Sequence, residues 1–370
     1  MAIDSTEEIK AVDDEETIGV ETATQPCDAR FIAIDNRPFP VFKIMMKIKN
    51  NEINLQPDIQ RNFVWDEIRQ SRLIESILIR IPLPSFYMDT MNDDEWLIVD
   101  GLQRLNTLNN FINKNELVLT GLEFLNNEAG GKTFSQLPRQ MQRRLEETAL
   151  SFYIIKPGTP TEAKLTIFKR LNTGGIALNS QEIRHCLYKG KSTGLLRELA
   201  KSEELKAAAG GSLSGLRMVE EECALRFCAF HLTKYQSYTR PGLDVFLGEA
   251  MKQINKMDDL EIESLKTAFI DSMLKAREIF GDYAFRKMYE VNGRRNPINK
   301  ALFETWSVSL SEHDIGLLRK HKEIIIELFI NVIRNDHDFN SSITQGTGDV
   351  KKVHARFSTV ERIIKEAMNQ

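Results

Sequence analysis

The chain has 370 residues, of which 42% are hydrophobic and 28% charged, a composition typical of folded globular proteins. At roughly 100–200 residues per domain, this length predicts two domains. The net charge of −4 excludes a protein that coats nucleic acid by bulk charge, although a local basic patch needs only a few clustered Lys and Arg side chains.

The cysteines and the apolar runs indicate the compartment. Cys27, Cys186, Cys223 and Cys228 lack the two-residue spacing of a zinc knuckle, which favours plain thiols in a reducing environment. The first residues lack the charged-then-apolar pattern of a signal peptide, and no apolar run approaches the ~20 residues of a membrane span. We therefore expect a cytoplasmic protein without a membrane partner.

The first 28 residues are rich in acid and poor in large apolar side chains. Such a segment buries too little surface to offset the entropy lost on ordering. Residues 1–28 are therefore expected to form a disordered acidic tail. A solvated tail is the simplest interpretation, and a DNA-mimicking or regulatory segment is the alternative.

Regular structure is predicted from Val41 onward. Apolar residues at helical spacing predict a helix over 41–48, and the alternation at Ile53 and Leu55 predicts a short strand. Asp66 is placed as the N-cap of a helix that runs to Ile81, where Pro82 ends it.

The next segment reads as a hairpin followed by a helix. Two apolar runs, 86–89 and 96–99, flank a polar cluster and predict antiparallel strands. Leu102, Leu105, Leu108 and Ile112 then recur at helical spacing. Further along, we expect helices over 138–147, 161–171 and 180–190 and a strand over 152–155. Only helical periodicity follows residue 191. The fold class is therefore α+β, with an α+β domain over 29–190 and an all-helical domain over 191–370.

The strongest candidate site is the sequence Asp100-Gly101-Leu102-Gln103-Arg104, where a strand meets a helix. Glycine permits a sharp turn, and the first turn of a helix attracts anions. Arg104 adds a fork of donors suited to phosphate, and Asp100 is placed to cap the helix, hold Mg²⁺ or orient a water. The alternative is a capped turn with a surface arginine.

Two further segments combine polar groups with turns. Arg61 precedes Phe63 and Trp65, which are more typical of core anchors than of base-stacking groups. Asn172 and Thr173 precede Gly174-Gly175 between two helices, where a turn offers hydrogen bonds to a ligand. A capping device and a helix-turn-helix are the alternatives there. The sequence contains neither a P-loop nor the elbow of a serine hydrolase.

Four separated motifs, taken together, resemble one known family. They are Gln-Arg-Asn-Phe-Val-Trp from Gln60, Ile-Pro-Leu-Pro from Ile81, Ile-Val-Asp-Gly-Leu-Gln-Arg-Leu from Ile98, and Arg-Leu-Asn-Thr-Gly-Gly from Arg170 with Gln-Glu-Ile-Arg from Gln181. Residues 40–190 resemble the N-terminal domain of GmrSD-type restriction proteins, which has a ParB/sulfiredoxin-like fold. The helical remainder is similar to stand-alone members without the HNH-type nuclease domain.

The resemblance implies a nucleoside triphosphate and Mg²⁺ as cofactors in bacterial defence against foreign DNA. Asp100, Gln103 and Arg104 would be catalytic, with Asp100 also the metal ligand. Gly101, Arg61, Asn172, Thr173, Gly174 and Arg184 would bind the nucleotide across one cleft. In the family the turn reads Asp-Gly-Gln-Gln-Arg, whereas Leu102 stands at its middle position here.

Two interpretations of the activity stay open. One is a Mg²⁺-dependent nucleoside triphosphatase, and the other is a non-catalytic nucleotide- or DNA-binding module that switches a partner. The expected partners are DNA, a partner nuclease or another defence protein, and a second copy of the chain. Because no nuclease constellation is visible after residue 190, we expect the chain alone not to cleave DNA.

Overall fold

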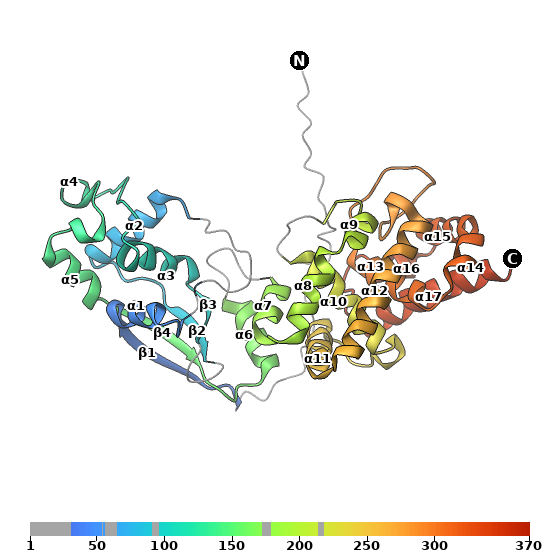
Figure 1. Cartoon of the computed structure of the whole chain (residues 1–370), viewed down its shortest axis with the longest axis horizontal. Helices are drawn as coiled ribbons and strands as arrows, with labels where there is room; N and C mark the ends of the chain where they lie inside the picture. The colour runs from blue at the N-terminus through green and yellow to red at the C-terminus, as the bar shows by residue number, and fades with distance from the viewer. Residues whose placement is uncertain (1–30, 54, 56–64, 91–95, 172–178, 214–217) are drawn as a thin grey trace, which may run out of the picture. The chain divides into compact units, whose positions relative to one another are not determined.

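The computed structural model describes residues 31–53, 55, 65–90, 96–171, 179–213 and 218–370 (Figure 1). Contacts within the chain divide it into two compact units, which meet between Asn179 and Ser180: the described residues from 31 to 179 form the first, and those from 180 to 370 form the second. The first unit contains a small sheet covered by helices, and the second is helical. This arrangement confirms the α+β fold class.

The sheet of the first unit has four strands in the order β1-β4-β2-β3. Its centre is the parallel pair of β2 (Phe86–Thr90) and β4 (Ala149–Ile155). β3 (Trp96–Asp100) pairs antiparallel with β2, which confirms the predicted hairpin. β1 (Ile34–Pro40) pairs antiparallel with β4 at the opposite edge.

One face of the sheet carries the hydrophobic core of this unit. Phe86 and Met88 of β2 and Phe152 and Ile154 of β4 point into it, because alternate residues of a strand share a face. Three longer helices pack there, namely α1 (Val41–Lys49), α2 (Glu67–Leu78) and α5 (Arg139–Glu147). α3 (Leu102–Leu108), which continues as the π-helical η3 (Asn109–Asn113), completes this layer with α4 (Asn126–Ala129) and η4 (Phe134–Gln136).

The helix α2 begins and ends with recognisable caps. The Asp66 side chain accepts a hydrogen bond from the Arg69 N–H at 2.7 Å, as its placement as N-cap predicts. The helix ends at Leu78, before the predicted Ile81, because Arg80 adopts the left-handed conformation with φ of 65°. Ile81 consequently lies outside the helix and is 50% exposed.

The predicted strand at Ile53 and Leu55 was wrong. Ile53 forms an isolated parallel bridge to Trp96, and its side chain is buried in the core, while Leu55 lies in no strand among the described residues. The apolar alternation in the sequence therefore reflects one buried side chain and one bridge.

A further helix of the first unit, α6 (Thr161–Leu171), is tied to the sheet by a buried ion pair. Lys164 Nζ lies 2.6 Å and 2.8 Å from the two carboxylate oxygens of Asp89 on β2. Burial raises the pKa of Asp89, although Lys164 opposes the shift. This ion pair therefore fixes α6 against β2.

The second unit is a bundle of helices with short connections. Its longer members are α8 (Lys191–Lys201), α10 (Val219–Leu232), α11 (Leu243–Lys256), α12 (Asp259–Phe280), α13 (Lys300–Ser311), α15 (Lys322–Asn335) and α17 (Val350–Met368). Shorter segments are α7 (Ser180–Leu187), α9 (Glu203–Ala209), η5 (Tyr235–Ser237), η6 (Gly281–Tyr283), α14 (Ile315–Lys320) and α16 (His337–Ser342).

The two units divide between Asn179 and Ser180, whereas the sequence placed the boundary at 190. Gly190 separates α7 from α8, and both helices pack against α10 in the same unit. A glycine that ends a helix therefore marks a turn inside the second unit rather than its edge.

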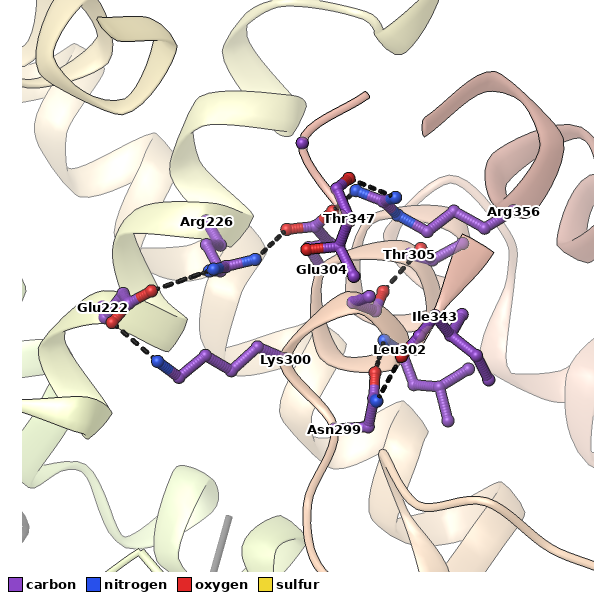
Figure 2. Close-up of polar contacts among 12 residues, drawn as sticks. Glu222, Arg226, Asn299, Lys300, Leu302, Glu304, Thr305, Ile343, Thr347 and Arg356 are labelled. Atoms are coloured by element: carbon purple, nitrogen blue, oxygen red, sulfur yellow. Dashed lines mark hydrogen bonds and ion pairs between the residues drawn. The ribbon is translucent and has the colours of Figure 1, made fainter. Parts of the chain in front are cut away.

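A chain of buried charges joins the helices of the second unit (Figure 2). Glu222 of α10 accepts from Lys300 at 2.8 Å and from Arg226 at 2.9 Å, and Arg226 reaches Glu304 of α13 at 3.0 Å. Glu304 is fully buried and also pairs with Arg356 of α17. Each carboxylate of this network has cationic partners. These partners offset the cost of burying the carboxylate away from water.

Among the helices that the structure describes, none is long and apolar enough to cross a membrane.

Candidate functional site

The turn from β3 into α3 is built around Gly101. Its φ of 100° lies in the left-handed region, which side chains rarely adopt. A Cβ atom at this position would lie 2.4 Å from Cδ1 of Phe86. Backbone conformation and the close approach of Phe86 therefore both require glycine, and they aim Asp100 and Arg104 at each other.

Arg104 is held by the protein on several sides. Its Nη2 donates to the Asp100 carboxylate at 2.8 Å and to the Ser85 carbonyl at 3.2 Å, and its Nη1 donates to the Pro84 carbonyl. The guanidinium carbon lies 4.3 Å from the centre of the Phe86 ring, a cation–π contact. Burial lowers the pKa of Arg104 and Asp100 opposes the shift, so the side chain stays charged.

These contacts give Arg104 a role that differs from the predicted phosphate fork. Both Nη groups point at protein acceptors, and only 10% of the side chain is exposed. Asp100, by contrast, is 34% exposed, and one of its carboxylate oxygens is fixed by Arg104. In this geometry Arg104 orients Asp100, and Asp100 is the group presented at the surface.

Gln103 contributes a polar atom that lacks a partner. Its Oε1 is buried without a hydrogen bond among the described residues. Its backbone carbonyl accepts from the Thr107 hydroxyl at 2.9 Å. The side-chain Oε1 is therefore the Gln103 acceptor that lacks a donor among the described residues. A buried acceptor without a donor is costly, so this amide is a site for a water or a ligand donor.

A pair of stacked tyrosines flanks the turn and was not predicted from the sequence. Tyr87 of β2 pairs in register with Asp100, next to a β-bulge, and its ring lies 5.0 Å from that of Tyr153. Burial raises the pKa of Tyr87, with smaller contributions from Tyr153 and Asp100. The pairing of distant strands brings these rings together, and no local motif indicates it.

The other predicted site residues fall in two groups. Arg61, Asn172, Thr173 and Gly174 lie outside the described residues. Arg184 lies on α7 of the second unit, where its Nε donates to Gln181 at 3.0 Å and its Nη1 pairs with Asp244. Its Nη2 is buried and has no hydrogen-bond partner among the described residues.

The described residues contain no group of three or more His, Cys, Asp or Glu side chains that could hold a metal ion. Asp100 offers a single carboxylate, with one oxygen occupied by Arg104. Mg²⁺ commonly takes one or two carboxylates and fills its remaining positions with phosphate oxygens and waters. Asp100 thus fits as one ligand of an ion that arrives with a nucleotide, and it does not form a metal site alone.

Comparison with known proteins identifies a family for part of the chain. Residues 41–189 match the family described as GmrSD restriction endonuclease, N-terminal domain. The matched range contains the sheet from β2 to β4, the Asp100 turn and the start of the second unit through α7. No curated protein and no solved structure matches the chain. The ParB/sulfiredoxin-like fold therefore stays a prediction.

Proposed function

Because the chain carries an N-terminal domain of the GmrSD restriction endonuclease family over residues 41–189, we propose that this domain binds a nucleoside triphosphate at the Asp100 turn as part of restriction of foreign DNA. The family match suggests a role related to restriction. We infer nucleotide binding from the Asp100 turn.

One observation carries the proposal: a partly exposed carboxylate held in a single orientation. Asp100 lies at the end of β3, and its Oδ2 is bonded to a buried arginine that is itself fixed by two carbonyls and an aromatic ring. Holding one side chain with so many contacts is typical of a preorganised site. The other carboxylate oxygen of Asp100 would accept from a nucleotide hydroxyl or amine, or bind Mg²⁺ that bridges the phosphates.

The phosphates themselves require other cations, since Arg104 is engaged by the protein. We propose Arg61, Asn172, Thr173 and Gly174 for this part, as the family resemblance implies.

A second candidate is nucleotide binding without hydrolysis, and Leu102 favours it. This residue stands where the family resemblance places a glutamine, and its side chain packs against the core. A packed leucine supplies neither a donor nor an acceptor for the attacking water. The domain would then switch a partner nuclease through occupancy alone.

A thermal-shift panel of nucleoside triphosphates with and without Mg²⁺ tests the proposal. A ligand present at 100 times its Kd stabilises the folded state by about 2.7 kcal/mol, which is readily measured. We expect at least one nucleotide to raise the melting temperature more with Mg²⁺ than without it. A panel in which no nucleotide has any effect would contradict the proposal. Phosphate release by the same samples separates the enzyme from the binding module.

A further inference from the structure

A second surface of the first unit has the chemistry of an anion-binding groove. A cavity of about 610 Å³ lies between the end of α2 and the exposed side of α5. The two helices belong to the first unit and pack against each other (Figure 1). One wall is the segment from Arg80 to Leu83, which follows α2. The other wall is formed by α5 and the start of β4. This groove does not include the Asp100 turn.

The α5 wall presents polar side chains in one row. Gln140, Arg143, Arg144 and Glu147 all line the groove, as residues three and four apart on a helix do. Arg144 is half-buried and donates to the Leu78 carbonyl at the end of α2 at 2.9 Å. Arg143 is exposed, and its side chain forms no ion pair or hydrogen bond with the part of the chain that the structure describes.

Arg80 supplies the opposite wall in an unusual backbone conformation. It follows α2 with φ of 65°, and Ile81 N–H bonds back to the Ser76 carbonyl at 2.8 Å. This is the position after a helix where glycine is strongly favoured, because a Cβ is strained there. Arg80 is exposed and, like Arg143, has no ion-pair partner among the described residues. Arg80 therefore holds a strained conformation at a position where glycine is usual.

Three arginines therefore surround the groove against one carboxylate, Glu147, in a chain whose net charge is negative. Unpaired arginines flanked by an amide such as Gln140 are the groups that contact nucleic-acid phosphates. We propose that the groove between α2 and α5 binds the phosphate backbone of duplex DNA, with Arg80 and Arg143 as the cations that contact it. The choice of DNA rests on the proposed role in restriction, whereas the basic character of the groove does not.

The test measures binding of a short labelled duplex to the full chain by fluorescence anisotropy over a range of salt concentrations. The variants are Arg80→Gly, Arg143→Ala and the double variant. Arg69→Ala is the matched control, since Arg69 is an exposed arginine of α2 outside the groove. Arg80→Gly relieves the strained backbone, so its melting temperature should equal or exceed that of the wild type.

We expect the double variant to bind the duplex at least about tenfold more weakly at low salt, because two charge-assisted contacts are lost. The slope of log K against log salt should fall by about 0.9 for each phosphate contact removed, or about 1.8 in the double variant. Arg69→Ala should match the wild type in both quantities.

Four results would overturn the proposal. One is a wild-type chain that does not bind the duplex, and another is a double variant that binds with unchanged affinity and slope. The third is an equal loss in Arg69→Ala, which would indicate diffuse surface charge. Preference for an acidic peptide over the duplex would assign the groove to a protein partner and also reject the proposal. Nucleotide-induced thermal shifts of the same variants report separately on the Asp100 turn.

Discussion

Arg104 contacts four groups at once, namely a carboxylate, two backbone carbonyls and the face of an aromatic ring. The sequence predicted an arginine in the first turn of a helix, and the structure places it there. The acceptors at Pro84 and Ser85 were not predicted, because they come from the segment before β2 and reach Arg104 only when β2 and β3 pair. Local spacing therefore identified the residue but not its role.

The substitution Arg104→Ala should lower the free energy of unfolding by about 2–4 kcal/mol. The change removes the bonds to Pro84, Ser85 and Asp100 and leaves two carbonyls without their donor. Arg104→Lys should recover only part of the loss, since an ammonium group lacks the planar fork. Urea denaturation measures both variants. A loss of under about 0.5 kcal/mol for the alanine variant would indicate an ordinary surface arginine.

The substitutions Gly101→Ala and Gly131→Ala form a matched pair. Gly101→Ala should destabilise the domain by about 2–4 kcal/mol, since a positive φ and a clash with Phe86 add together. Gly131 also has a positive φ, 73°, but no atom lies within 4 Å of its added Cβ, so Gly131→Ala should cost only about 1 kcal/mol. Equal denaturation midpoints for the two variants would contradict the packing role of Phe86.

At the scale of the element, helices with a single apolar face were predicted well, and the edge strand of the sheet was predicted less well. α1, α2 and the β2–β3 hairpin follow from apolar spacing and one N-cap. β1 was missed because Pro38 and Pro40 disfavour a strand in sequence. Prolines are tolerated there because β1 is an edge strand, and its only partner among the described strands, β4, lies more than a hundred residues away in sequence.

The contact between α10 and α13 should depend on pH through Glu222. Burial alone would raise the pKa of Glu222, but Lys300, Arg226 and Arg184 outweigh it and hold the pKa well below its usual range. The unfolded chain then takes up a proton near pH 4.3 while the folded chain does not. Stability from this group is therefore present above that pH and is lost as the pH falls.

Glu222→Gln should consequently cost about 3 kcal/mol at neutral pH, because Arg226 and Lys300 lose a buried partner. The difference between wild type and variant should shrink as the pH falls below about 4.3, by up to about 1.4 kcal/mol per pH unit. Denaturation curves at several pH values check this trend. A difference that stays constant with pH would show that Glu222 acts through packing rather than charge.

At the scale of the whole molecule, the sequence predicted an α+β part followed by a helical part, and the structure has both. The boundary differs because glycines also end helices inside a domain. The candidate site was only partly accessible to sequence reasoning. The Asp100 turn is a local motif, whereas the tyrosine pair and the α2–α5 groove require strands and helices that are distant in sequence.

The central claim is that the Asp100 carboxylate binds a nucleotide. Isothermal titration of a nucleoside triphosphate with Mg²⁺ into the wild type and Asp100→Asn tests it most directly. Asparagine still offers an oxygen to Arg104, so the fold should be retained while the charge is removed. Asp35→Asn is the control, since Asp35 is a carboxylate on β1 of the same sheet. We predict at least about tenfold weaker binding for Asp100→Asn, the effect of one charge-assisted contact, and wild-type binding for the control. Equal affinity in all three proteins would contradict the account.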